Sequence, residues 1–200
     1  MLPNATMSRR TLITGAAGFA VALSSPNIVR ATPLGRVGSN RLWIQRLDTG
    51  ETLDAPFLVS DAALNKQAWM LWSHFWRDAK DHNQAVWMDR KLLVVLNKMQ
   101  MRMSAFRGEE VQILLTSGYR TPERNATIEG AAPHSYHCKG MASDIAGRGI
   151  AHAKCADIGE EVSAEAGSYM GGLGRYPGFT HVDTGHRNTS TGHLRRWGRN

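Results

Sequence analysis

Residues 41–59 carry the first clear pattern of apolar and polar positions in the chain. The segment 41–47 is rich in apolar and aromatic residues, and a second extended segment, 51–59, follows the tripeptide Asp48-Thr49-Gly50. An Asp and a Gly between two such segments are typical of a tight turn between strands. The pattern therefore predicts a β-hairpin.

A helical pattern follows the hairpin. Ser60 or Asp61 supplies a cap, and Leu71 and Phe75 belong to a series of apolar residues with helical spacing. Three tryptophans, at positions 69, 72 and 76, widen the apolar face of this helix. We expect these rings to pack in the core.

A second helix is predicted from residue 85 to residue 106. Apolar residues again recur at helical spacing, and Gly108 stands just beyond the last of them. Met99, Met101 and Met103 lie within this segment. Their helical spacing favours core filling over a soft-metal site.

The second half of the chain alternates short strands with one helix. Strands are predicted at 111–116, 141–146, 167–174 and 179–184, and a helix is predicted at 150–166. Residues 123–132 are polar and irregular, and Arg120 stands at the edge of this long loop. The order of elements predicts an α+β fold in a single domain, with a small antiparallel sheet flanked by helices.

The composition is that of a folded, globular protein. Of the 200 residues, 42% are hydrophobic and 20% are charged, and six tryptophans can anchor a core. Apart from a weak apolar segment near the start, no run has the length of a membrane-spanning helix.

Residues 1–31 have the pattern of an export signal. Arg9 and Arg10 directly precede an apolar segment rich in Ala and Gly, and Ala31 is a small residue at a plausible cleavage point. Paired arginines are typical of the twin-arginine route, which exports folded proteins. An N-terminal amphipathic helix and an uncleaved anchor are the alternatives. We expect a cleaved signal, a flexible leader at 32–40, a catalytic domain at 41–200 and a periplasmic location without a stable membrane span.

The net charge of the chain without residues 1–31 indicates which kinds of partner it can bind. Loss of residues 1–31 removes three arginines and no acidic residue, so the net formal charge falls from +7 to +4. A mildly basic exported domain suits an anionic partner such as a cell-wall polymer or a membrane surface. The export signal and the scattered charges disfavour nucleic acid as a partner.

Residues that could bind a metal or take part in catalysis lie in two segments of the second half of the chain. His137 and Asp144 are joined by a glycine and small residues, which suit a loop that leads into a strand. His181 and Asp183 are two positions apart, so on a strand both face the same side. Two imidazoles and one carboxylate form a zinc-type ligand set, and three protein ligands leave a fourth position open, as in catalytic sites. The spacing alone does not decide for a metal, because the chain has no short contiguous zinc signature.

The two cysteines leave several interpretations open. In an oxidising compartment Cys138 and Cys155 can form a disulfide, but Cys138 can also be a free thiol or a further metal ligand. A cysteine nucleophile is a rival explanation of the chemistry. In an extended segment, however, Cys138 and the adjacent His137 point to opposite sides, which disfavours a catalytic pair.

Longer motifs around these residues resemble a known family. The pattern Ser-x-His-x-x-Gly-x-Ala-x-Asp at 135–144 and the later Phe-x-His-x-Asp-Thr-Gly at 179–185 resemble the LAS-type zinc peptidases. This group takes in D-Ala-D-Ala metallopeptidases, murein endopeptidases and the hedgehog-like fold. Trp43, the Ser-Gly-Tyr-Arg run at 117–120 and the glycine-rich run at 171–177 extend the similarity over most of the chain. Within the group the chain looks most like twin-arginine-exported murein endopeptidases of the bacterial cell wall.

The resemblance implies one zinc ion per chain, bound by His137, Asp144 and His181. Zinc would lower the pKa of its water to about 7 and would polarise the scissile carbonyl. Asp183 is a candidate general base, and the alternative is that it orients an imidazole from behind. Many relatives have a Glu or Asp three positions before the last histidine, where this chain has Gly178.

The resemblance also implies roles for three residues near the ligands. Arg120 is similar to the family arginine that holds a substrate carboxylate or stabilises the oxyanion, and a salt bridge within the loop is the alternative. We expect Ser135 to orient a neighbouring ligand or the turn beside the substrate. Tyr176 is expected to line the cleft.

The function that the resemblance implies is a zinc-dependent murein endopeptidase that hydrolyses the peptide cross-links of peptidoglycan. We expect a monomer whose partner is the peptide stems of peptidoglycan. A D-alanyl carboxypeptidase of the same fold and a non-catalytic, zinc-containing cell-wall-binding module are the alternatives. Relatives differ over whether the bond joins two diaminopimelates or a D-alanine and a diaminopimelate.

Overall fold

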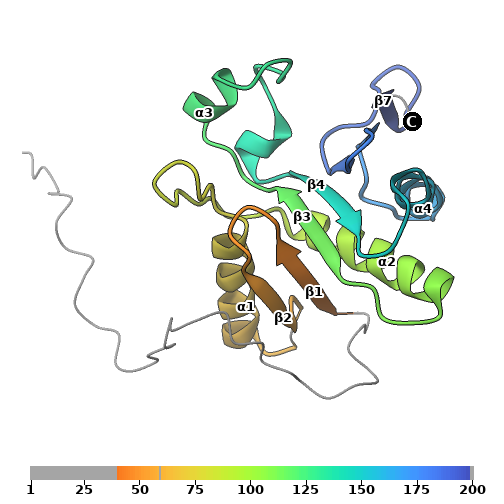
Figure 1. Cartoon of the computed structure of the whole chain (residues 1–200), viewed down its shortest axis with the longest axis horizontal. Coiled ribbons are helices and arrows are strands. Elements are labelled where there is room, and N and C mark those ends of the chain that lie inside the picture. The colour runs from red at the N-terminus through yellow and green to blue at the C-terminus, as the bar shows by residue number, and fades with distance from the viewer. Residues whose placement is uncertain (1–39, 59, 199–200) are drawn as a thin grey trace, which may run out of the picture. The chain divides into compact units, whose positions relative to one another are not determined.

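Seven strands form one mixed sheet, in the order β2-β1-β3-β4-β6-β5-β7 (Figure 1). The strands are β1 (Arg41–Arg46), β2 (Thr52–Pro56), β3 (Ile113–Ser117), β4 (Ala142–Gly147), β5 (Gly172–Arg175), β6 (Thr180–Asp183) and β7 (Arg195–Gly198). The helices are α1 (Ala62–Phe75), α2 (Arg90–Arg107), α3 (Pro122–Ala126) and α4 (His152–Ala164), with a 3₁₀ turn, η1 (Tyr136–Lys139). This computed structural model describes residues 40–58 and 60–198. The predicted export signal at 1–31, and the predicted leader except Asn40, lie outside the described residues.

The predicted α+β class and the single domain are confirmed, because all described residues belong to one compact unit, Ala31–Asn200. The prediction of a small antiparallel sheet is wrong. β1 pairs in parallel with β3, and β5 pairs in parallel with β7, whereas the other neighbours are antiparallel. A parallel pair needs a long crossover, here through α1 and α2 for β1 and β3, so no local pattern reveals it. The seventh strand lies in a short polar segment that has no strand pattern of its own.

The first predicted elements are confirmed in type. β1 and β2 form the antiparallel hairpin, with Ile44 paired to Leu53. The tryptophan-rich helix is α1, and both Trp72 on this helix and Trp76 directly after its end are fully buried. Leu71 was placed on the wrong face of this helix, because 46% of it is exposed.

Helix α2 begins five residues later than predicted. Asp89 caps it, and its side chain accepts a hydrogen bond from the backbone N–H of Lys91 at 3.0 Å. The residues before it are extended, and the N–H of Met88 donates to Ser73 Oγ at 3.1 Å. Gly108 ends the helix, as predicted. The short helices α3 and η1 were not predicted, since neither is long enough to show a helical period.

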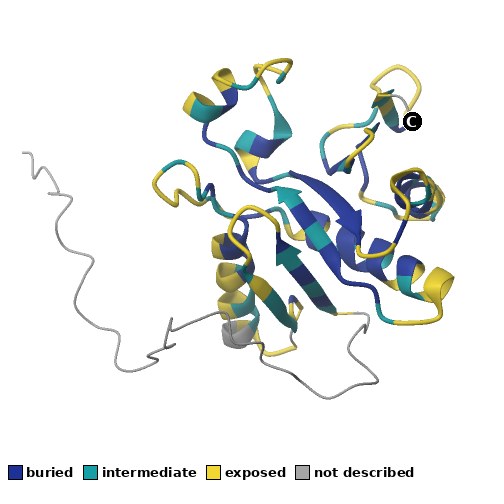
Figure 2. Ribbon diagram, in the orientation of Figure 1, coloured by how far each residue is buried: buried dark blue, intermediate teal, exposed yellow. Residues whose placement is uncertain are grey.

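The core lies between the sheet and its helices, and every residue of β4 is buried (Figure 2). α2 contacts β1 and β4, while α4 contacts β4, β5 and β6. Met99 and Met103 are fully buried, which confirms core filling, although 41% of Met101 is exposed. In the described parts of the chain, no helix combines the length and the apolar character needed to cross a bilayer.

Helix α4 approaches β5 closely at Gly159. A Cβ atom at this position would lie 2.4 Å from Leu173 Cδ1, and Leu173 is buried in the core. Glycine inside a helix is less favourable than alanine by about 1 kcal/mol. The close approach of helix to sheet explains why a glycine nevertheless stands here.

We predict that Gly159→Ala lowers the free energy of unfolding by about 1–3 kcal/mol, because overpacking exceeds the gain in helix propensity. Denaturant unfolding measures the change. In a double-mutant cycle with Leu173→Ala, Gly159→Ala should lower the free energy of unfolding by less, since the Leu173 side chain that the added methyl group contacts is then absent. A Gly159→Ala variant at least as stable as the parent would contradict the close packing.

Candidate metal centre

Two neighbouring strands in the middle of the sheet bring a carboxylate and an imidazole together. In the antiparallel pair of β4 and β6, Asp144 is the direct partner of His181. Side chains of directly opposite residues lie on the same face of a sheet, with Cβ atoms roughly 4.5–5.5 Å apart. The register of this one pair therefore fixes half of the site.

The turn η1 adds His137 immediately before β4. Ser135 caps this turn, and its Oγ accepts a hydrogen bond from the backbone N–H of His137 at 3.3 Å. His137 is almost fully buried, with 1% of its surface exposed. Ser135 thus sets where the turn begins and, with it, the direction of the His137 ring.

The three side chains converge on one point. His137 Nε2 lies 3.2 Å from Asp144 Oδ1 and 3.2 Å from His181 Nδ1, and His181 Nδ1 lies 2.8 Å from Asp144 Oδ1. In the part of the chain that the structure describes, one group of this kind is found, with its ligand atoms within 4.8 Å of one another.

This spacing fits a zinc ion. Tetrahedral bonds of 2.0–2.1 Å from zinc to nitrogen and oxygen place neighbouring ligand atoms about 3.3 Å apart. The observed separations of 2.8 to 3.2 Å are close to that value. Imidazole and carboxylate are also ligands that zinc prefers, and the three residues would leave one tetrahedral position open.

The far nitrogen of each imidazole faces an acceptor. His137 Nδ1 lies 2.7 Å from the carbonyl oxygen of Gly118, and His181 Nε2 lies 3.3 Å from Asp183 Oδ2. In these contacts the far nitrogens donate their protons. With a metal bound, the near nitrogens would be unprotonated and would offer it a lone pair, which is the common arrangement around a metal-binding histidine.

Asp183 lies on the far side of His181 and is fully buried. Its Oδ1 accepts hydrogen bonds from Arg195 Nη2 at 2.6 Å and from the N–H of Gly185 at 2.8 Å. On the neighbouring strand β5, a Cβ at Gly172 would come within 2.3 Å of Asp183 Oδ2. The glycine-rich run at 171–174 thus gives the carboxylate its space, and both oxygens of Asp183 have partners.

The electrostatics of the site follow from burial and these contacts. Burial opposes ionisation of Asp144, but the charges and hydrogen bonds of His137 and His181 prevail and hold the pKa of this carboxyl well below its ordinary value. Burial lowers the pKa of His137. For His181, hydrogen bonds to Asp144 and Asp183 outweigh burial, so its pKa is raised. Asp144 is therefore ionised at neutral pH, as a metal ligand must be.

Arg120 lies at the edge of the centre. Its Nη2 is 4.0 Å from Asp144 Oδ2, and its Nε is buried without a hydrogen-bond partner among the described residues. Burial lowers the pKa of this guanidinium from its ordinary value, but an arginine stays charged at neutral pH. A charged guanidinium thus lies next to the three converging side chains.

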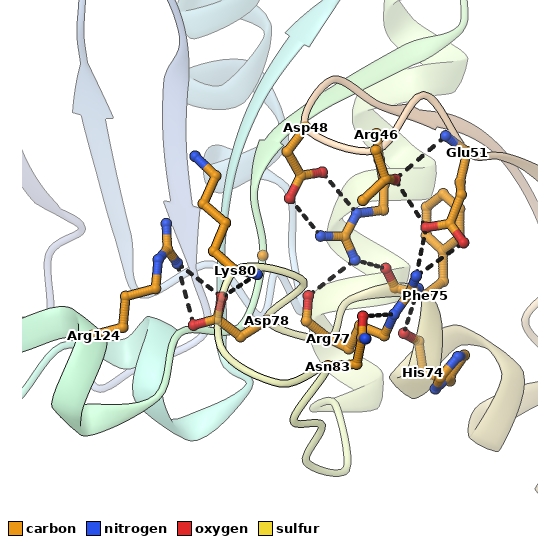
Figure 3. A network of polar contacts seen from close by, with 12 residues as sticks. Arg46, Asp48, Glu51, His74, Phe75, Arg77, Asp78, Lys80, Asn83 and Arg124 are labelled. Carbon is orange, nitrogen blue, oxygen red and sulfur yellow. Dashed lines mark hydrogen bonds and ion pairs between the residues drawn. The ribbon is translucent and has the colours of Figure 1, made fainter.

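A buried aspartate holds the loop that presents Arg120. Asp78 accepts a hydrogen bond from the N–H of Thr121 at 3.0 Å. It also accepts from Arg124, whose Nη1 lies 3.2 Å from both carboxylate oxygens (Figure 3). Arg46, also buried, donates to the carbonyl oxygens of Phe75 and Arg77 directly before Asp78 (Figure 3). The hairpin, the end of α1 and the loop after β3 are thereby joined in one network.

Tyr176 is connected to His181 through the ring of Trp197. Its hydroxyl accepts a hydrogen bond from Trp197 Nε1 at 2.9 Å, and the Trp197 ring lies 5.1 Å from the His181 ring. Tyr176 also stacks on Phe179 with 4.5 Å between ring centroids. Tyr176 is 36% exposed, so it stands at the surface beside His181.

The cysteines are both free in the structure. Cys155 is buried in α4 beside Met103, whereas Cys138 lies on η1. Burial raises the pKa of the Cys138 thiol from its ordinary value. A nucleophilic cysteine needs the opposite shift, so the geometry does not favour a cysteine hydrolase.

Sequence reasoning missed several residues of this region. Gly118 contributes only a backbone carbonyl, and Arg195 and Trp197 come from β7, which no local pattern marked. Tyr136 and His186 form a further pair, with the tyrosine hydroxyl 2.5 Å from His186 Nδ1. Their roles depend on contacts between distant parts of the chain, so no motif revealed them.

Comparison with known proteins identifies a family. The model of a family described as "Peptidoglycan L,D-endopeptidase MepK" matches residues 36–190, a range that contains all three converging side chains. No curated protein matches the chain. The family model covers most of the chain and supports the resemblance to LAS-type peptidases drawn from the motifs.

We predict that Asp183→Asn weakens zinc binding about 10- to 100-fold, because the neutral side chain no longer fixes and polarises His181. Competition with a chromophoric chelator measures the affinity. Asp157→Asn, which changes a surface aspartate paired with Arg175, is the matched control and should bind zinc like the parent.

A different outcome would assign another role to Asp183. If Asp183→Asn keeps full zinc affinity and loses only turnover on a peptide substrate, the residue acts on the proton of the attacking water and does not orient His181.

Proposed function

The chain belongs to the family of peptidoglycan L,D-endopeptidase MepK, and from this premise we propose that it is a zinc-dependent murein endopeptidase that hydrolyses peptide cross-links of peptidoglycan. One observation carries the zinc-dependent part of the proposal. His137, Asp144 and His181 converge with ligand atoms 2.8 to 3.2 Å apart inside the region that the family model matches.

Both imidazole ligands have partners that would hold them in place for the metal. When bound, zinc would polarise a scissile carbonyl and lower the pKa of a water molecule at its open position to about 7. The carbonyl of Gly118 and the carboxylate of Asp183 orient the two imidazoles, and Ser135 fixes the turn before His137. Since both oxygens of Asp183 have partners, its geometry supports the orienting role over that of general base.

Arg120 is proposed to bind the substrate at a negatively charged group. Its guanidinium lies beside Asp144, and the buried Nε has no partner among the described residues. A substrate carboxylate, or the oxyanion that develops on the scissile carbonyl, would supply one. Such a fixed cation stabilises developing charge most where water is excluded. We place Tyr176 at the rim of the same cleft, next to Trp197 and His181.

The family description bears on which cross-link is cleaved. An L,D-endopeptidase cuts between an L-configured and a D-configured centre. The bond between two diaminopimelates is of this type, whereas the bond between D-alanine and diaminopimelate joins two D-centres. We therefore propose the diaminopimelate–diaminopimelate cross-link as the substrate, with the peptide stems of peptidoglycan as the partner.

The substrate also bears on the location. Peptidoglycan lies outside the cytoplasmic membrane, which supports an extracytoplasmic location for the chain. The paired arginines at positions 9 and 10 support export by the twin-arginine route into the periplasm, with residues 1–31 as the signal.

Digestion of purified sacculi by the mature protein tests the proposal. We expect loss of cross-linked muropeptide dimers, measured by mass spectrometry, which also identifies the bond. A chelator should abolish the loss and zinc should restore it, and His137→Ala should be inactive because one ligand is missing. Arg102→Ala, which changes an exposed arginine on α2, is the control and should digest like the parent.

Other outcomes of this digest would favour the alternatives. Loss of terminal D-alanine with intact dimers would indicate a carboxypeptidase. Unchanged muropeptides, with zinc shown to be bound, would indicate a non-catalytic wall-binding module.

For Arg120→Ala we predict a loss of turnover of about 100- to 1,000-fold, because the variant lacks the cation that stabilises negative charge on the substrate. Its zinc content should be unchanged, because all three proposed metal ligands are still present. Steady-state kinetics on a purified cross-linked dimer separate two roles. A loss in kcat indicates stabilisation of the oxyanion, and a rise in KM alone indicates binding of a substrate carboxylate. Turnover equal to that of Arg102→Ala would leave Arg120 with a structural role in its loop.

A further inference from the structure

An exposed aromatic and cationic surface lies near the turn that carries His137, and the proposed chemistry does not use it. It consists of Trp87 and Tyr169, each 48% exposed, with Trp69, Arg90 and Lys91. The centroids of the Trp69 and Trp87 rings are 4.3 Å apart, and the Arg90 guanidinium lies 4.4 Å from the Trp69 centroid. Lys91 Nζ lies 5.5 Å from the Tyr169 centroid. We call these five residues the aromatic platform.

The platform is held rigidly. Trp69 Nε1 donates to the carbonyl oxygen of Met88 at 2.7 Å, so the ring on which Trp87 rests is fixed. The N–H of Met88 itself donates to Ser73 Oγ at 3.1 Å. A single exposed tryptophan is unremarkable on a protein surface, but Trp87 packs on the fixed Trp69 ring, which also carries the Arg90 guanidinium, and this arrangement resembles a prepared binding surface.

Asp89, which lies between Trp87 and Arg90 in the chain, is hydrogen-bonded to both ligand segments. The N–H of Asp89 donates to the carbonyl oxygen of Gly140, which ends the turn that carries His137. Asp89 Oδ2 accepts a hydrogen bond from Thr184 Oγ1 at 2.6 Å, directly after β6 and His181. A Cβ at Gly140 would lie 3.0 Å from the carbonyl oxygen of Trp87. The platform therefore lies next to the two segments that carry His137 and His181.

The charge of the aromatic platform indicates which kind of molecule it can bind. Arg90 and Lys91 are exposed, and among the described residues their cationic groups lie over the Trp69 and Tyr169 rings. The nearest acidic residue in the chain, Asp89, uses its oxygens to cap α2 and to bind Thr184. The surface is thus positively charged and suits a polymer that carries carboxylates.

We propose that the aromatic platform binds the glycan strand of peptidoglycan, with a sugar ring on the exposed face of Trp87. A pyranose ring presents a flat face of C–H groups that packs on an indole, and the carboxylates of the attached stems match Arg90 and Lys91. This inference rests on the proposed function, because it takes the substrate to be peptidoglycan. It adds that the protein recognises the polymer as well as the cross-link.

Trp87→Ala tests the platform, and Phe106→Ala is its matched control. Phe106 is 59% exposed and lies under Lys154, 4.9 Å from its ring centroid, at the opposite end of α2. The probe is a soluble N-acetylglucosamine tetramer, with binding followed by calorimetry, a readout that needs no hydrolysis. We expect Trp87→Ala to weaken binding by about tenfold or more, Trp87→Phe to retain most of it and Phe106→Ala to leave it unchanged.

Hydrolysis provides a second readout. Turnover of intact sacculi should fall in Trp87→Ala, while turnover of a cross-linked peptide dimer without sugars should stay at the parent value. Equal binding and equal turnover of sacculi by Trp87→Ala and Phe106→Ala would overturn the platform, as would absence of tetramer binding by the parent. Tetramer binding that depends on Trp87, in a parent that cleaves neither substrate, would support the platform and contradict the endopeptidase.

Discussion

The pairing of β4 with β6 is the constraint on which the rest of the site depends. Because Asp144 is opposite His181, a shift of one residue in this register would turn one of the two side chains to the other face of the sheet. Neighbours on both sides hold the register: β3 pairs with β4, and β5 pairs with β6. All six residues of β4 are buried, so a slip would also expose core residues. The geometry of the metal centre is thus protected by the same pairing that stabilises the fold.

Burial of polar groups makes this centre sensitive to each of its contacts. His137 and Asp183 have almost no exposed surface, and an unpaired polar group at such a depth costs about 1–3 kcal/mol or more. The carbonyl of Gly118 pairs with the His137 ring. The Asp183 carboxylate is paired with His181, Arg195 and the N–H of Gly185. The arrangement therefore extends from the ligands to β7 at the edge of the sheet. A change at Arg195 would leave a buried carboxylate with one partner fewer, although this residue lies well outside both motifs.

How far the sequence predicts this molecule depends on how local each feature is. The hairpin, the main helices and the two ligand segments follow from patterns within about ten residues, and the structure has them. The parallel pairs β1–β3 and β5–β7 depend on contacts between distant segments, so they were not foreseen. The start of α2 was placed too early because a capping aspartate, Asp89, outweighs the apolar spacing before it. The convergence of His137, Asp144 and His181 was expected from motifs, but the partners behind the imidazoles were visible only in the fold.

The contacts of Asp183 bear on position 178, where this chain differs from many LAS-type relatives. Where many LAS-type relatives have an acidic residue, this chain has a glycine, and a Cβ there would meet nothing within 4 Å. The acidic residue of this segment stands instead at Asp183, on the same face of β6 as His181 but behind its ring. A carboxylate in that position raises the basicity of the imidazole and fixes its tautomer, and its burial keeps it from the open side where a water would react. The orienting role proposed for Asp183 is therefore compatible with a glycine at position 178, because the carboxylate of this segment already lies behind the His181 ring.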